Sequence, residues 1–489
     1  MPAAGLDIDI LIVGAGPVGL FLANECARRN LRWRIIETNR SQSLHSKALA
    51  IFPRTMEIFD MAGVVQPFLQ AANKVTSVAV ITHGHTLAQM PFKPEETPYS
   101  FVAMVPQDVT EKILAEELQR KGGHVEYETT FVSARQENDN EYVEATLDHR
   151  GERTTVRTAF VVGCDGAHSA VRKTINIPLE GGEYADAYML ADIETNDALP
   201  ADQMQLCPSE LGPAAIFPMS ATRRRVVATI KHEEGDAPSL ELVRKVLAER
   251  APAGIEARSM NWSSYFHIHH RHAAKLRVGR IFIAGDAAHI HSPFGGQGMN
   301  TGLHDVWNLV WKLDLFLHRH GTEQLLESYS AERLPVIENV ISTTDRLTKV
   351  MGTPSRFAQA LRNAVIPMIS RLAPFQHAFV QRLSELGIAY SDSPLVEGPG
   401  ERYFDDSMRG GEGIRSRFLM FANYANAPTK AQAASQLSKS LDEVVELRPS
   451  KSPGWKLVRP DGYVAYTSQG GDPEEATVAM RSLLLKQAG

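Results

Sequence analysis

The N-terminal segment contains the pattern that most constrains how this chain can fold. An apolar run from Ile8 to Val13 leads into GAGPVG at residues 14–19, and a helix-forming stretch continues to about Arg29. A second strand is predicted over Leu31 to Ile36 and ends at Glu37. Short apolar runs bounded by glycine are typical of buried parallel strands. The order strand, glycine turn, helix, strand predicts a Rossmann-type βαβ unit.

The glycines of this turn indicate what it can bind. Gly14, Gly16 and Gly19 follow G-x-G-x-x-G, where a Cβ would block the turn, the approach to a pyrophosphate, or helix packing. The helix start offers N–H groups to phosphate, and Glu37 stands where a carboxylate accepts from a ribose hydroxyl. We therefore expect a dinucleotide site. Because the sequence shows no second unit of this kind, FAD is favoured as resident cofactor, with NADPH or NADH docking transiently.

A second glycine-rich segment, GDAAHIHSPFGGQGMN at residues 285–300, follows an apolar run from Arg280 to Ala284. The run predicts a buried strand that brings Asp286 to its tip. The glycines at 295–298 let backbone N–H groups approach a planar ring. The helix that begins near Met299 would point its positive end toward that ring. Together with the first unit, this segment predicts a flavoenzyme.

Composition argues against several other classes of protein. The 489 residues suffice for roughly three domains. With 51 Lys and Arg against 57 Asp and Glu, the net charge of −6 gives no overall basic field, so neither nucleic acid nor a membrane is expected as a partner. Three cysteines without a CxxC pair argue against a disulfide framework or zinc site and fit a reducing cytoplasm. The apolar run at 10–23 is too short to span a bilayer, so we expect a cytoplasmic location.

Three motifs at these spacings resemble those of a known family. They are the G-x-G-x-x-G turn, DGAHSAVR at residues 165–172, and the segment at 285–300. Over most of residues 8–340 the chain resembles the FAD-dependent aromatic hydroxylases, the single-component class A flavoprotein monooxygenases that include para-hydroxybenzoate and phenol hydroxylases. Further likenesses are PRTME at 53–57, VPQDVTEKIL with Gln107, DVWNLVWKL at 305–313 and LESYSAERLPV at 326–336.

The resemblance assigns cofactor roles to individual residues. Asp286 would accept from ribityl hydroxyls, and Gln107 would bond to the same chain or the neighbouring ribose. Asp165 would serve FAD and nicotinamide binding, with Arg172 open to a phosphate or carboxylate. Lys47 stands where the family usually has arginine; lysine keeps the charge but loses the bidentate fork. The cofactor-binding residues implied are Gly14, Gly16, Pro17, Gly19, Glu37, Thr38, Lys47, Arg54, Gln107, Asp165, Gly285, Asp286, Gly296, Gly298, Met299 and Asn300.

The implied reaction is hydride transfer from NADPH or NADH to FAD, followed by addition of O2 at flavin C4a. One oxygen atom of the hydroperoxide would then pass to a phenolic or polycyclic aromatic substrate, a small molecule. An epoxidase or Baeyer–Villiger oxygenase on the same scaffold stays open as an alternative. So do a flavin reductase or dehydrogenase that inserts no oxygen, and a binding protein that retains FAD.

Candidates around the reacting atoms follow from the same resemblance. Pro293 would offer its carbonyl and ring to the oxygen-transfer pocket, or else be a helix-flanking proline without a chemical role. The predicted catalytic positions are Pro293, Gly298 and Met299. Apolar strand residues would line the substrate, against the alternative that they are ordinary core: Met189, Phe217, Met219 and Trp262, with Pro293 beside them.

Three further clusters suggest other chemistry. The histidines at 267–270 predict no metal site, because two share one strand face, the third points away, and no cysteine or carboxylate completes a tetrahedron. Asp286, His289 and Ser292 are too crowded in one turn for a hydrolytic triad. The arginines at 223–225 are expected in a solvated turn, with neutralisation of an acidic substrate as the alternative.

The expected fold class is α/β. It comprises a Rossmann-type FAD-binding domain, an inserted, mostly antiparallel β-sheet substrate domain, and a C-terminal domain. The resemblance to phenol and polyketide hydroxylases implies that the last is thioredoxin-like, although it lacks CxxC. The expected boundaries are 1–75, 105–180 and 276–345 for the FAD-binding domain, 76–104, 181–275 and 346–394 for the substrate or middle domain, and 395–489 for the thioredoxin-like domain.

Two later segments carry their own signals. Residues 346–390 predict amphipathic helices that pack on the sheet or on a partner subunit, as in a homodimer, more readily than on a membrane. The turn RPDG at 459–462 predicts a hairpin, because proline sets φ and glycine permits the reversal. A last helix should begin at Asp472, with Pro473 in its first turn.

Overall fold

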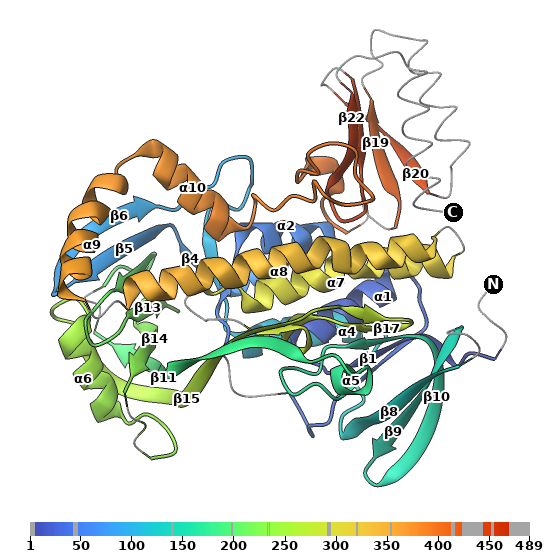
Figure 1. Ribbon diagram of the computed structural model, residues 1–489, viewed down its shortest axis with the longest axis horizontal. Helices are drawn as coiled ribbons and strands as arrows, with labels where there is room; N and C mark the ends of the chain where they lie inside the picture. The colour runs from blue at the N-terminus through green and yellow to red at the C-terminus, as the bar shows by residue number, and fades with distance from the viewer. Residues whose placement is uncertain are drawn as a thin grey trace.

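The computed structural model describes residues 5–42, 47–137, 141–196, 199–231, 233, 235–290, 295–318, 321–352, 355–411, 416–422, 444–450 and 454–468. In Figure 1 one sheet lies below the long helices α7 (Gly298–Leu317) and α8 (Glu323–Met351), a second sheet lies around the left end of α8, and a smaller C-terminal sheet lies above the helices. The fold is therefore α/β, as the sequence predicts. No described helix is long and apolar enough to cross a membrane.

The first sheet confirms the N-terminal βαβ unit. Strand β1 (Ile8–Val13) lies between β2 (Trp33–Ile36) and β10 (Glu152–Gly163) and is parallel to both, while α1 (Pro17–Arg28) connects β1 to β2. Every residue of β1 is buried, as expected for a central parallel strand. The sheet continues through β17 (Ile281–Ile283), parallel to β10, and through the antiparallel strands β16 (Arg277–Val278), β8 (Thr129–Glu137) and β9 (Tyr142–His149).

The second sheet confirms the predicted inserted, mostly antiparallel sheet. Its strand order is β18-β15-β11-β14-β13-β12-β5-β6, and among its described pairings only β12 with β5 is parallel. One face packs on α6 (Leu240–Arg250). The strands are β5 (Ser77–Thr82), β6 (His85–Pro91), β11 (Leu179–Thr195), β12 (Gln203–Cys207), β13 (Ala214–Pro218), β14 (Arg223–Ile230), β15 (Ala257–Ala273) and β18 (His289–Ile290).

Helix α7 is buried on all sides along most of its length. One side carries Leu303 and Trp307 in the main apolar core. The opposite side is covered as well, because Trp311 and Leu315 belong to a separate apolar cluster with the C-terminal sheet. The remaining elements are α2 (Pro53–Met61), α3 (Val65–Ala71), α4 (Gln107–Arg120), α5 (Ala170–Thr174), α9 (Arg356–Ile369), α10 (Ala373–Ser384) and the small sheet of β3 (Ala50–Ile51), β7 (Val102–Met104) and β4 (Asn73–Val75).

The C-terminal sheet has the strand order β20-β19-β21-β22. The hairpin expected around RPDG is confirmed by β21 (Trp455–Val458) and β22 (Val464–Ser468), which pair antiparallel, and Gly462 has φ of +81°. Strand β19 (Phe418–Ala422) runs parallel to β20 (Val445–Pro449). The helix expected from Asp472 lies outside the described residues, and the thioredoxin-like assignment stays a prediction.

Candidate functional site

The structure explains the glycines of the first turn in different ways. Gly14 has φ of +101°, and a Cβ there would overlap the carbonyl of Cys164; a Cβ at Gly19 would overlap the carbonyl of Gly14. At Gly16, the N-cap of α1, a Cβ would meet no atom within 4 Å, and no side chain caps the helix. The first N–H groups of α1 therefore face open space, which suits a phosphate.

Glu37 is held beside this turn by hydrogen bonds from the backbone. Its Oε2 accepts from the N–H of Ala15 at 2.9 Å, and its Oε1 accepts from the N–H and the side-chain amide of Asn39 at 3.0 and 2.7 Å. Thr38 is exposed and Pro17 is buried in the first turn of α1. The carboxylate that the sequence assigns to a ribose is thus fixed in place near the start of α1.

The second glycine turn meets the first through Val18. Gly285 opens a 3-10 turn at Gly285–Ala287 after β17, and a Cβ there would lie 3.0 Å from Val18 Cγ2. A Cβ at Gly302 in α7 would lie 2.7 Å from the same atom. We call the turn at 14–19, the turn at 285–287 and the start of α7 at Gly298 the three-turn site. The segments that the sequence assigns to one cofactor thus lie together.

The side chain of Asp286 in the three-turn site reaches solvent. Its carboxyl group nevertheless has protein atoms packed densely around it, which partly bury it. This burial raises the pKa of its carboxyl, while the nearby charges of His289 and Lys47 oppose the rise. Lys47 itself is exposed. A carboxylate that is open to solvent fits an acceptor for ligand hydroxyls.

The start of α7 has a glycine in a left-handed backbone conformation and a helix end that no side chain caps. Gly296 has φ of +63°, a conformation that favours glycine, and Gln297 at the N-cap makes no side-chain cap hydrogen bond. Gly298 is half-buried and Met299 is 9% exposed. The predicted Pro293 lies outside the described residues.

Asn300 has a structural position that the sequence did not indicate. Its Oδ1 accepts from the Phe52 N–H at 3.0 Å and from Thr55 Oγ1 at 2.8 Å, and its Nδ2 donates to the carbonyls of Ala50 and Gly296 at 2.9 and 3.1 Å. The side chain is fully buried, so these bonds use most of its capacity. Asn300 therefore positions the glycine loop against α2 instead of facing a ligand.

Two other predicted cofactor residues also hold protein segments. Gln107 Oε1 accepts from the N–H of Ala48 at 3.2 Å, next to Lys47. Asp165 Oδ2 accepts from the first N–H groups of α5, at 2.7 Å from Ala170, whereas its buried Oδ1 has no hydrogen-bond partner in the described structure. That unused acceptor lies in the loop that touches Gly14, and it is where a bound ligand could donate.

Arg54 and Arg172 correct the sequence-based assignments. The guanidinium of Arg54 is fully buried, donates to Glu57 at 3.0 Å and to the carbonyl of Asp461 at 2.9 Å, and therefore joins α2 to the C-terminal turn. Arg172 donates to the carbonyls of Ala287 and Ala167 at 2.9 and 3.0 Å. Each arginine is thus held by one group nearby in sequence and one from a distant segment, Asp461 for Arg54 and Ala287 for Arg172.

The arginines at 223–225 also lie elsewhere than predicted. They begin β14 instead of forming a solvated turn, and Arg224 and Arg225 are 0% and 1% exposed. Arg225 forms a bidentate pair with Asp192 at 2.7 and 2.8 Å, and donates to the carbonyls of Lys47 and Ala48 at 3.1 Å each. This contact joins the second sheet to the segment beside the three-turn site.

Strand register separates the predicted substrate-lining residues. Directly paired residues share a face, so the pairs Asp192 with Trp262 and Arg225 with Phe217 put these four side chains on one face. Met189 lies on the opposite face and is fully buried against α6, which makes it core. Phe217 and Met219 pack beside Leu49 and Phe52, on the segment that follows Lys47.

A buried ionic chain beneath the Asp286 turn was missed by sequence reasoning. Asp305 Oδ2 lies 2.7 Å from His289 Nε2 and accepts from the Gly285 N–H at 3.1 Å, while its Oδ1 accepts from Arg333 Nε at 2.8 Å. Burial alone would raise the pKa of Asp305, but His289 and Arg333 outweigh it and hold the pKa at about 2. The signal was present in the likenesses at 305–313 and 326–336, to which no role was given.

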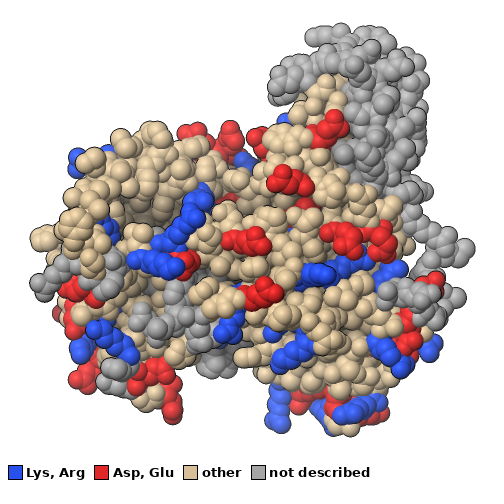
Figure 2. All heavy atoms as spheres, viewed as in Figure 1, with Lys and Arg blue, Asp and Glu red and all other residues tan. Residues whose placement is uncertain are grey.

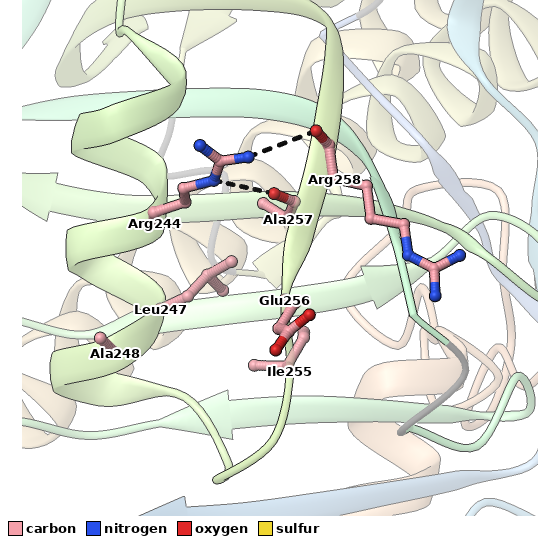
Figure 3. A pocket seen from close by; sticks show the side chains of 7 residues that line it. All are labelled: Arg244, Leu247, Ala248, Ile255, Glu256, Ala257 and Arg258. Carbon is pink, nitrogen blue, oxygen red and sulfur yellow. Dashed lines mark hydrogen bonds between the residues drawn. The ribbon is translucent and has the colours of Figure 1, made fainter.

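The other clusters carry no comparable chemistry. Among the described residues no group of His, Cys, Asp or Glu could hold a metal ion. The exposed His267 pairs with Glu233 at 3.2 Å, and His289 contacts Asp305 instead of entering a triad. Figure 3 shows a shallow pocket between α6 and β15 in which Arg244 donates to the carbonyls of Ala257 and Arg258 at 2.9 and 3.4 Å. None of the predicted site residues lines it.

Comparison with known proteins agrees with this geometry. A family described as FAD binding domain matches residues 7–344, so the chain belongs to this family. The chain is 30% identical to 6-methylpretetramide 4-monooxygenase of Streptomyces rimosus, over 99% of this chain and 95% of that protein. It is 29% identical to the rifampicin monooxygenase of Streptomyces venezuelae, over 96% and 98%. Such relatives place it among the flavin-dependent monooxygenases and confirm the resemblance.

Solved structures show the same fold over the whole chain. The anhydrotetracycline hydroxylase OxyS of Streptomyces rimosus is similar with a TM-score of 0.79 and 26% identity, covering 99% of each chain. The flavin-dependent monooxygenase PieE, solved with FAD and substrate, has a TM-score of 0.81 at 20% identity. The residues of the three-turn site, with its open helix starts and its unused acceptor on Asp165, fit FAD as the cofactor.

Proposed function

We propose that this protein uses NADPH or NADH and O2 to hydroxylate a phenolic or polycyclic aromatic compound. The observation that carries the proposal is the meeting of the turns at 14–19 and 285–287 with the start of α7 around Val18. Phe217 of the second sheet packs with Phe52, which lies next to Gly296 just before α7. Relatives named as monooxygenases of aromatic polyketides and rifampicin support this substrate class.

The chain's own groups would bind and orient the cofactor. The open N–H groups of α1 at Gly16 would bind the pyrophosphate, Glu37 a ribose, and Asp286 the ribityl hydroxyls. When bound, FAD supplies the redox chemistry by accepting hydride from the nicotinamide and reacting with O2. Lys47 keeps a positive charge near Asp286 and the phosphates.

The start of α7 would stabilise negative charge on the flavin ring. A helix dipole contributes typically ~0.3–1 kcal/mol, and about 2 when partly buried, which is small for a buried anion. The N–H groups at Gly298 and Met299, in the first turn of a helix whose N-cap side chain makes no cap hydrogen bond, would therefore have to donate directly. The role of Pro293 in oxygen transfer stays part of this proposal.

The second sheet would orient the substrate and exclude water. Phe217, Met219 and Trp262 provide an apolar wall near the segment that follows Lys47. Arg225 is already neutralised by Asp192, so it offers no free charge to a carboxylate substrate. A neutral aromatic ring fits this face better than an acid.

The test measures reductant consumption and the fate of oxygen. Phenols, naphthols and polycyclic aromatic polyketides are added to the purified enzyme with NADPH or NADH under isotopically labelled dioxygen. The masses of the products are then measured by mass spectrometry. We expect a substrate that stimulates consumption and yields a hydroxylated ring carrying one labelled oxygen. Turnover without label would favour a reductase or dehydrogenase, and a labelled epoxide or ester would favour the alternative oxygenases.

A further inference from the structure

Helix α9 presents large apolar side chains to solvent. Phe357, Leu361, Ala364 and Met368 are exposed and recur at the spacing of one helix face. Phe357 is 80%, Met368 67% and Leu361 55% exposed. An ordinary surface helix turns such a stripe toward the core.

The buried positions of α9 include polar residues. Arg362 is 7% exposed and donates to the carbonyl of Met351 at 3.1 Å, and Gln359 is 9% exposed. Both are more deeply buried than Phe357 or Leu361 on the outer face. Packing of α9 against the second sheet therefore does not explain why its outer face is apolar.

The exposed stripe continues into the neighbouring elements. Six of the nine exposed large hydrophobic residues in the described part of the chain lie between residues 350 and 375. We call them the apolar ridge: Val350, Phe357, Leu361, Met368, Leu372 and Phe375. Figure 1 places α9 and α10 at the edge of the molecule, and the space-filling view over them is largely tan (Figure 2). Large apolar side chains exposed in this number within one stretch of the chain indicate an interaction site.

Along the sequence, the segment that carries the ridge contains charges of one sign only. Between Asp345 and Glu385 the sequence contains no acidic residue, although the whole chain has a net charge of −6. Arg371 and Arg382 are exposed and have no ion pair with a described residue. The six basic residues of the stretch are Arg346, Lys349, Arg356, Arg362, Arg371 and Arg382.

We propose that the apolar ridge docks this protein on an anionic lipid bilayer. Phe357, Leu361 and Met368 would enter the boundary between headgroups and acyl chains, while Arg371 and Arg382 would contact lipid phosphates. The expectation of no membrane partner rested on the net charge of the whole chain. Electrostatic attraction in solution extends over about 8 Å at physiological salt. The basic residues beside the apolar ridge therefore matter more for lipid binding than the net charge of the whole chain. This proposal goes beyond the proposed function and does not depend on it.

The charge pattern favours lipid over a second copy of the chain. A two-fold interface repeats the same patch on both subunits, so Arg371 and Arg382 would face a surface of their own sign. An anionic bilayer instead offers apolar interior and complementary charge together. An acidic protein would offer only the complementary charge.

The test uses the full-length, FAD-loaded enzyme and vesicle flotation. We expect binding to vesicles of phosphatidylcholine mixed with phosphatidylglycerol, none to phosphatidylcholine alone, and weaker binding in high salt. The variant Leu361→Gln/Met368→Gln should lower the partition coefficient on the order of tenfold. Arg371→Gln/Arg382→Gln should lower it several-fold and reduce the salt dependence.

The matched control is Val132→Gln/Arg153→Gln, which changes an exposed apolar and an exposed basic residue on other strands and should bind vesicles as the parent does. Flavin absorbance and circular dichroism confirm folding of each variant. The proposal fails if the parent ignores mixed vesicles or if the ridge variants bind equally well. A dimer in sedimentation that Leu361→Gln/Met368→Gln abolishes would assign the ridge to a second copy, and binding to poly-glutamate without vesicle binding would assign it to an acidic protein.

Discussion

At Gly14 the backbone has φ of +101° and a Cβ would overlap Cys164, whereas at Gly16 a Cβ would meet nothing within 4 Å. One motif thus contains a glycine that the fold requires and a glycine that the fold itself does not require, for which we propose a role in binding the phosphate. Gly14→Ala should destabilise the apoprotein by about 1–3 kcal/mol through backbone strain and overlap. Gly16→Ala should change its stability by less than about 1 kcal/mol.

Gly16→Ala should weaken FAD binding although it leaves the stability of the apoprotein almost unchanged. Gly16→Ala inserts a methyl group where the phosphate approaches, so we expect the Kd for FAD to rise on the order of tenfold, or about 1.4 kcal/mol. Urea unfolding of the apoprotein and flavin fluorescence titration measure the two effects. Unchanged FAD affinity in Gly16→Ala would show that this side of α1 does not face the cofactor.

Asp286 should couple stability to pH in the absence of FAD. Its folded-state pKa is raised above the ordinary 3.8 by burial, so the folded state holds the proton more tightly than the unfolded state. This contribution to the apoprotein's stability is complete at low pH and is lost as pH rises through the folded pKa. Asp286→Asn should therefore be more stable than the parent at neutral pH, yet bind FAD more weakly.

Urea unfolding of both apoproteins across the acidic and neutral range checks this sign. Asp406→Asn is a suitable control, because the Asp406 side chain is 95% exposed and should leave the profile unchanged. Equal pH profiles for Asp286→Asn and its parent, or full FAD occupancy in the variant, would remove the role assigned to this carboxylate.

At the scale of elements, Arg225 on β14 holds the second sheet to the segment beside the three-turn site, while Asp192 on the neighbouring β11 neutralises its charge. Arg225 and Asp192 are almost fully buried, and Arg225 also binds the carbonyls of Lys47 and Ala48. Removing one partner leaves a buried charge, so Arg225→Met should cost about 3–5 kcal/mol of unfolding free energy. Asp192→Leu/Arg225→Met should cost less than the sum of the single changes.

A double-mutant cycle by urea denaturation gives the coupling energy directly. Arg153→Met is a matched control, because Arg153 is exposed and lies 3.8 Å from Asp148. Additive effects of the Arg225 and Asp192 changes would mean that these two side chains do not act as a buried ion pair.

At the scale of the whole molecule, buried charges join the C-terminal sheet to the long helices. Glu332 on α8 accepts from Arg459 at 2.7 and 2.8 Å and from Lys312 on α7 at 2.7 Å, and Arg459 also pairs with Asp461. Burial lowers the pKa of Lys312 to about 8 although Glu332 opposes it. The sheet is therefore part of the same cooperative structure as α7 and α8.

Glu332→Gln should lower the unfolding free energy by about 3–5 kcal/mol, because it leaves Arg459 and Lys312 without their shared anion. Differential scanning calorimetry should show one transition in the parent and a lower Tm in the variant. Glu446→Gln, on the exposed side of β20, should leave the Tm unchanged. Two separate transitions in the parent would contradict a joined C-terminal sheet.

The sequence by itself determined the elements whose causes are local. Glycine spacing and apolar runs predicted the first βαβ unit, and the turn RPDG predicted the hairpin of β21 and β22, because backbone conformation and strand period depend on neighbours in the chain. The motifs at 14–19 and 285–300 also indicated the cofactor class, since the chemistry of a phosphate or ring contact is carried by short segments.

Only the tertiary structure decided which face a side chain takes and which partner it meets. Strand pairing placed Met189 against α6 and buried Arg225 on Asp192, and distant carbonyl groups occupied Arg54. Asn300 was assigned to the cofactor by its neighbours in sequence, but the folded chain surrounds it with α2 and the glycine loop. Register and long-range contacts arise between segments far apart in sequence, so no local pattern contains them.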